Sequence, residues 1–60
     1  MNTQRALEIS ESPVMANVIY EGKQVYIQHV NEENNTARIY PLDHPQQEQN
    51  VPINMLIEHE

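Results

Sequence analysis

This sequence lacks cysteine, tryptophan and phenylalanine, and it contains a single glycine. Without cysteine the chain forms no disulfide and no thiolate zinc site. With one glycine it has no glycine-rich loop to hold phosphates. All three aromatic residues are tyrosines, so a buried core has to be built mainly from aliphatic side chains.

Basic residues are also few. Lys and Arg together number three and Asp and Glu together number nine, which gives a formal net charge of -6. Binding to the DNA backbone depends on Lys and Arg at the phosphates. The basic residues are Arg5, Lys23 and Arg38, which lie far apart in the sequence. We therefore expect no binding to duplex DNA.

The chain has no apolar run of membrane-spanning length and no signal-peptide pattern at its start. We expect a soluble protein that is not exported and does not associate with a membrane. Its length of 60 residues predicts one small domain covering residues 1–60. So short a chain buries only about 60% of its unfolded surface, which predicts a stability of a few kcal/mol.

A three-stranded meander is predicted over residues 15–42, and the rest of the chain is organised around it. The dipeptide Glu21-Gly22 separates two runs rich in Val, Ile and Tyr, as expected for a two-residue primed turn. That turn fixes a register with three facing pairs: Tyr20 with Lys23, Val18 with Val25, and Ala16 with Ile27.

Side chains alternate along a strand, so this register predicts one apolar face and one mixed face. The apolar face contains Ala16, Val18, Tyr20, Val25 and Ile27. The mixed face contains Met15, Asn17, Ile19, Gln24, Tyr26, Gln28 and Val30.

The second turn is predicted at residues 31–35, where Asn34 and Asn35 tolerate the left-handed conformation. Pairing Ile27 with Ile39 and His29 with Ala37 keeps the apolar face intact and places His29 on it. A slip that pairs Ile27 with Tyr40 stays open at this point. Since Pro41 lacks a backbone donor, the third strand is at an edge there or ends there.

The flanking segments predict a helix, a loop and a closing strand. Residues 1–12 favour helix, with Thr3 as N-cap, and Ala6 and Ile9 along one side; Ser12 before Pro13 ends it. Residues 43–50 are predicted to form a polar loop, and residues 51–57 the closing strand and turn. Within that last segment we expect a strand over residues 51–53, a single turn at Met55-Leu56 capped by Asn54, and extended chain from Ile57. The fold class is α+β, mainly β, and an SH3-like barrel is one way in which this antiparallel meander closes.

The sequence predicts no catalytic, cofactor-binding or metal-binding residues. The spacing of His29, His44 and His59 matches no ligand motif, and the carboxylate pairs Glu32/Glu33 and Glu58/Glu60 are typical of solvated charge. Ser10 and Ser12 lack a partner set for nucleophilic catalysis. A base-stacking platform would need Tyr20, Tyr26 and Tyr40 to act together with Arg38 and Lys23, but Tyr20 and Tyr26 are predicted on opposite faces.

Several motifs resemble, in the same order, those of the H-type small acid-soluble spore proteins, and the resemblance covers nearly the whole chain. The motifs are Arg5-Ala6-x-Glu8-Ile9, Ser12-Pro13, Val18-x-Tyr20-x-Gly22, Val25-x-Ile27-x-x-Val30, Thr36-Ala37-Arg38-Ile39, Pro45 and Val51-Pro52-Ile53-x-x-Leu56. The sequence departs from the family pattern at Leu7, Gln24 and Asn31, which are predicted surface or turn positions.

The resemblance implies a minor, non-enzymatic protein of the bacterial spore core, made in the forespore during sporulation. It implies no enzymatic residues and no cofactor, and it does not extend to the DNA-coating spore proteins of the α/β type. Packing, amino-acid storage and a weak interaction are the roles that this setting allows.

Two other classes remain as alternatives: a small β-barrel module that binds a partner or peptide at a sheet edge near Pro41 or Pro52, and a nucleic-acid binder. A homodimer is expected on separate grounds. No disulfide or metal supports the core, and the mixed face exposes apolar side chains.

Overall fold

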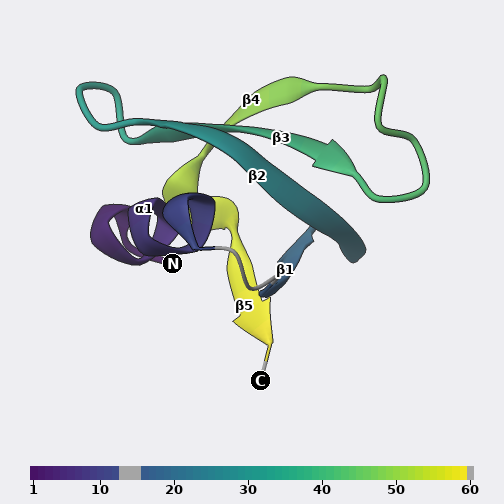
Figure 1. Ribbon diagram of the computed structural model, residues 1–60, viewed down its shortest axis with the longest axis horizontal. Helices are drawn as coiled ribbons and strands as arrows, with labels where there is room; N and C mark the ends of the chain where they lie inside the picture. The colour runs from purple at the N-terminus through teal and green to yellow at the C-terminus, as the bar shows by residue number, and fades with distance from the viewer. Residues whose placement is uncertain (13–15, 60) are drawn as a thin grey trace.

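The computed structural model describes residues 1–12 and 16–59 of the chain (Figure 1). Within these residues, five antiparallel strands form one sheet in the order β4-β3-β2-β1-β5, with one α-helix packed against one side. The elements are α1 (Thr3–Glu11), β1 (Asn17–Tyr20), β2 (Lys23–Asn31), β3 (Thr36–Pro41), β4 (Gln49–Pro52), the 3-10 helix η1 (Ile53–Met55) and β5 (Ile57–His59). The predicted class, a short N-terminal helix followed by a mainly antiparallel β fold, is confirmed.

The sheet does not close into a barrel, so the SH3-like barrel is not formed. β4 and β5 lie at opposite ends of the strand order, and η1 connects them beneath the sheet (Figure 1). β5 has three residues and uses them to pair with β1. Pro52 ends β4 without a backbone donor. Two such short strands offer few hydrogen bonds for closure.

The first turn forms as predicted. Glu21 and Gly22 both have positive φ, 51° and 79°, which a two-residue primed turn requires. Val18 pairs with Val25 and Tyr20 pairs with Lys23, which confirms the register. This ladder begins at Val18, so the expected Ala16–Ile27 pair lies outside it.

The second turn is one residue shorter than predicted, because Asn31 belongs to β2 and pairs with Thr36. The side-chain oxygen of Asn31 accepts hydrogen bonds from the backbone nitrogens of Glu33 and Asn34, at 3.0 and 3.2 Å. Asn35 adopts the left-handed conformation with φ 54°, as the sequence predicted for this pair of asparagines.

A β-bulge between Ile27 and His29 changes the second half of β2. Ile27 faces Ile39 as predicted, which excludes the one-residue slip. Beyond the bulge His29 faces Arg38, so the predicted His29–Ala37 pair is wrong. The extra residue turns His29 to the outer side and Val30 into the core, whereas the prediction placed His29 at the rim of the apolar face and Val30 on the mixed face. The physical reason is that the bulge turns an aliphatic side chain, in place of an imidazole, toward α1.

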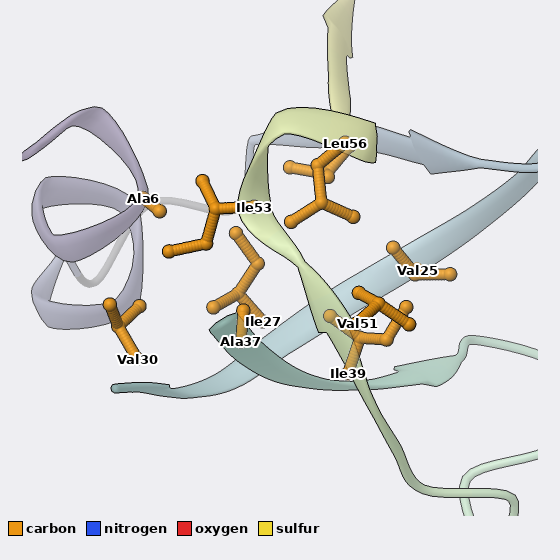
Figure 2. Packing of buried hydrophobic residues seen from close by; sticks show 10 residues of the cluster. Ala6, Val25, Ile27, Val30, Ala37, Ile39, Val51, Ile53 and Leu56 are labelled. Carbon is orange, nitrogen blue, oxygen red and sulfur yellow. The ribbon is translucent and has the colours of Figure 1, made fainter. Parts of the chain in front are cut away.

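The hydrophobic core lies between α1, the inner side of the sheet and η1 (Figure 2). Ala6 is fully buried, so the helix backbone approaches the sheet closely, and Ile53 of η1 fills the space beside it. The buried hydrophobic residues of this core are Ala6, Val18, Val25, Ile27, Val30, Ala37, Ile39, Val51, Ile53 and Leu56. All of them are aliphatic, as the shortage of aromatic residues predicted.

The helix begins at Thr3, so its N-cap lies one residue earlier than predicted. Asn2, not Thr3, is the N-cap, and its side chain accepts a 2.7 Å hydrogen bond from the Arg5 nitrogen. Thr3 is thereby free to donate from its hydroxyl to Asn35 Oδ1 at 2.9 Å, which links α1 to the β2–β3 turn. The helix ends at Glu11, and Ser12 is extended, as expected before a proline.

The C-terminal third contains less loop than predicted, because β4 already begins at Gln49. The predicted Asn54 cap is wrong, since η1 starts at Ile53 after Pro52 and has no side-chain cap. Burial of Ile53 in the core and the fixed φ of Pro52, -61°, account for this earlier start. Extended chain resumes at Ile57 and β3 ends at Pro41, both as predicted.

Candidate functional site on the outer sheet face

The two faces of the sheet differ in what covers them. α1 and η1 both pack on the inner face, and among the described elements no helix covers the opposite face (Figure 1). We call this uncovered side the outer face. Residues opposite each other in an antiparallel ladder point to the same side. The registers therefore place these residues on it: Asn17, Ile19, Gln24, Tyr26, His29, Arg38, Tyr40, Asn50, Ile57 and His59. Leu42, which follows β3 and bonds to the Gln24 carbonyl, continues the alternation on the same face.

Two tyrosines occupy the centre of the outer face. Tyr26 and Tyr40 are direct cross-strand partners, with ring centroids 5.3 Å apart and planes inclined by 36°. This separation is typical of attractive aromatic pairs. Each ring restricts the other, so the pair forms a preorganised apolar surface. Tyr26 remains 37% exposed.

Aliphatic side chains extend this apolar surface toward both ends of the sheet. Ile57 of β5 is 59% exposed and pairs with Ile19 of β1. Leu42 follows β3, donates its backbone N–H to the Gln24 carbonyl at 3.2 Å and is 37% exposed. Together with the two tyrosines, these residues form an exposed apolar patch on a small protein.

The outer face has no carboxylate among its strand residues. Glu58 is the one acidic residue in the described strands, and its register partner is the buried Val18, so it points to the inner side. The outer face instead has Arg38, which lies between His29 and Asn50 in the ladder. On a chain of net charge -6, this side is the exception to the acidic character.

The inner side holds an ion pair that connects the helix to the last strand. Arg5 donates from Nε to Glu58 Oε1 at 2.9 Å and from Nη2 to Oε2 at 2.6 Å. The hydrogen bond from Arg5 lowers the pKa of Glu58 below its ordinary value, and the same bond raises the pKa of Arg5. A cleft of about 310 Å³ beside them is also lined by Ile9 and Ala16, and it reaches the edge of the sheet at the Asn17–His59 pair. Its two opposite charges bind each other, so this arrangement is structural.

The three histidines lie apart. His29 and His59 are on the outer face, while His44 Nδ1 lies 3.1 Å from Asp43 Oδ1 in the β3–β4 loop. The hydrogen bond from His44 lowers the pKa of Asp43. Over residues 1–12 and 16–59, no three His, Asp or Glu side chains are grouped as a metal ion would need. No helix in this part of the chain has the length and apolar character to span a membrane.

The other polar residues singled out in the sequence have local structural roles. Ser10 donates from its hydroxyl to the Leu7 carbonyl at 2.8 Å, within the helix. Glu32 and Glu33 are exposed in the β2–β3 turn. Glu58 is paired with Arg5, and Glu60 lies outside the described residues.

The sequence identified part of the outer face. Ile19 and Tyr26 point outward as predicted, Tyr20 points inward, Val30 belongs to the core, and Met15 lies outside the described residues. Tyr40, Leu42 and Ile57 were not assigned to this face. Alternation from Ile39 was the signal that would have found Tyr40 and Leu42, whereas Ile57 depends on the β1–β5 pairing, which no local pattern indicates.

These features define a small, acidic, mainly β protein with one uncovered sheet face and an ion pair that joins its helix to its last strand. The comparison with known families specifies this class further. The model of the small acid-soluble spore protein H family matches residues 1–58. No solved structure matches the chain.

Curated relatives of the chain have the same family name. A small, acid-soluble spore protein H from Halalkalibacterium halodurans is 63% identical over 59 residues, covering 98% of each chain. The protein of that name from Bacillus subtilis is 64% identical over 58 residues, covering 97% of this chain and 98% of its own. One from Alkaliphilus metalliredigens is 49% identical and is covered completely.

The chain belongs to the small acid-soluble spore protein H family. It is therefore a sporulation protein and not a member of an enzyme family, as the resemblance implied. The names of its relatives support its location in the spore, where the sequence resemblance had placed it in the core.

Proposed function

We propose that this protein acts in the spore core as a non-catalytic binding protein that uses the outer face of its sheet. The observation that supports the proposal is the uncovered apolar patch around the Tyr26–Tyr40 pair. Both α1 and η1 pack against the inner face, so the outer face contributes little to the core. A surface of this composition is typical of interaction sites, in which tyrosine provides contact area at low entropic cost.

The sheet edges support binding less well than the outer face. β4 ends at Pro52, which has no N–H, and β5 spans three residues, or about 10 Å. A peptide that extends a sheet needs a row of free backbone groups. The peptide-binding alternative at these edges is therefore disfavoured, and the outer face is the stronger candidate.

Photo-crosslinking in sporulating cells tests the proposal. A photoreactive phenylalanine replaces Tyr26 in one variant and Met55 in a control, because Met55 is 52% exposed but lies in η1. We expect a cross-linked product from position 26 in forespores and much less from position 55. Equal yields, or no product at either position, would overturn the proposal and favour a storage role without a defined partner.

A further inference from the structure

We infer that the partner of the outer face is a second copy of the chain, packed outer face to outer face about a two-fold axis. This inference rests on the proposed function, since it names the partner of the same surface. It is carried by two properties of the molecule: the distribution of charge and the area that a dimer needs.

Charge distribution selects the outer face for self-association. Two copies with a net charge of -6 repel each other wherever carboxylates approach. Most acidic residues lie in α1, in the turns and in the β3–β4 loop, and Glu58 faces the inner side. Among the described strand residues the outer face has no acidic side chain, so two copies meet there with carboxylates only at the rim.

Nucleic acid fits the same face less well. Phosphate contacts need several Lys or Arg side chains, and Arg38 is the one such residue on the described outer face. Carboxylates at the rim, such as Asp43 next to Leu42, oppose a phosphate backbone. The apolar centre therefore favours a protein surface, and the acidic rim disfavours a polyanion.

The size of the molecule favours a face and not an edge. A small specific interface buries roughly 600 Å² per partner, and even the broadest side of this molecule, the one seen in Figure 1, measures only 28 by 22 Å, also roughly 600 Å². Contact has to extend over most of one side to reach that area. Edge pairing through the three residues of β5 falls far short of it. Face-to-face packing of two sheets, about 10 Å apart, provides more contact than edge pairing does.

A two-fold arrangement follows from the outer face being complementary to itself. In such a dimer the patch of each copy covers the patch of the other, so no patch remains exposed. If the outer face instead bound the acidic inner side of the next copy, each copy would still expose one patch, and assembly would continue into filaments. The two arrangements therefore differ in the size of the species that forms.

Sedimentation equilibrium over a wide concentration range tests the inference with two matched variants. Tyr26→Glu places a carboxylate in the centre of the outer face, and Met55→Glu places one on a more exposed hydrophobic residue elsewhere. We expect wild type and Met55→Glu to form dimers with similar dissociation constants. For Tyr26→Glu we expect a dissociation constant larger by at least about tenfold, as for a central interface residue. Circular dichroism verifies that both variants fold, and Tyr26→Phe should retain the dimer.

The outcomes separate this inference from the proposed function. A monomer at all concentrations, with a cross-link from position 26 to another protein in forespores, would overturn the second copy as partner and leave the binding role intact. A monomer without any such cross-link would overturn both. Dimers that both glutamate variants weaken equally, or species that keep growing with concentration, would overturn the face-to-face arrangement.

Discussion

The inner and outer faces of this sheet are formed by the same strands, and they have opposite compositions. Along β3, the inward side chains Ala37 and Ile39 are buried almost completely, whereas the neighbouring Arg38 and Tyr40 face outward. The inner face contains the aliphatic core beneath α1, and the outer face has aromatic and basic groups without a covering layer. The comparison indicates that the packing that stabilises the fold is concentrated on the inner face, which leaves the outer face available for the binding role that we propose.

The largest expected effect comes from a charge on the inner face. Ile27→Asp places a carboxylate where the side chain is 2% exposed and faces Ile39. Burying an unpaired carboxylate costs several kcal/mol, comparable to the whole stability of a chain this small. We expect an unfolded protein at neutral pH by circular dichroism and amide proton dispersion.

The matched substitution on the other face is Tyr26→Asp, which changes the adjacent, outward residue of the same strand. We expect it to keep a folded spectrum. If both variants fold, or both unfold, the division of roles between the faces is contradicted.

The bulge in β2 predicts a smaller contrast between two consecutive residues. Val30→Ala removes buried methyl groups next to the helix and should lower the free energy of unfolding by about 2 kcal/mol. His29→Ala changes an exposed outer-face residue and should alter it by less than about 0.5 kcal/mol. Urea unfolding of both variants measures the difference. A larger loss of unfolding free energy for His29→Ala than for Val30→Ala would contradict the bulge and favour the register without it.

That contrast also shows how far the sequence predicts this fold. The Glu21-Gly22 turn and its alternating flanks determine the first hairpin, because the turn and the hydrophobic pattern indicate the same register. In the second hairpin the turn and the hydrophobic pattern do not indicate one register. Strict alternation holds up to Ile27, and the bulge after it shifts the faces of His29 and Val30. Whether His29 or Val30 faces inward is decided by α1, which is far away in sequence.

The candidate site is subject to the same limit. Ile19, Tyr26 and Tyr40 follow from alternation within the meander. Ile57 joins them through the long-range β1–β5 pairing, and Arg5 meets Glu58 through docking of the helix. Such contacts depend on tertiary structure and leave no local signal in a single sequence.

The Arg5–Glu58 pair predicts a modest effect of pH on the inner side. In the folded state the pKa of Glu58 lies below its ordinary value of 4.5, mainly because of the hydrogen bond from Arg5. The unfolded chain therefore binds this proton more tightly than the folded protein. The contribution of the pair is complete above a pH of 4.5, and it is lost as the pH falls through the lowered pKa.

We expect Glu58→Gln to lower Tm slightly at pH 7, with a difference from wild type that shrinks toward pH 3. Thermal melts at both pH values measure this change, and Glu48→Gln in the exposed β3–β4 loop is the control. Both side chains of the pair are partly exposed, so the effect should be small. A difference that grows on acidification would show that the pair does not stabilise the fold.

The smallest expected signal is that for duplex DNA. Arg5 is engaged with Glu58, and the three basic residues lie on separate elements of an acidic protein. We expect no gel shift and no nuclease protection at physiological salt, with or without millimolar calcium. Protection in both conditions would overturn this expectation, and protection only with calcium would confine it to dilute buffer without calcium.

A dilution series followed by two-dimensional amide NMR tests the central claim most directly. If the outer face joins two copies, resonances of Tyr26, Arg38 and Tyr40 shift with concentration, while those of the buried Ile39 and Ala6 stay nearly constant. Concentration-dependent shifts confined to α1 or to the edge of β4, or no shifts at any concentration, would contradict the assignment of self-recognition to the outer face.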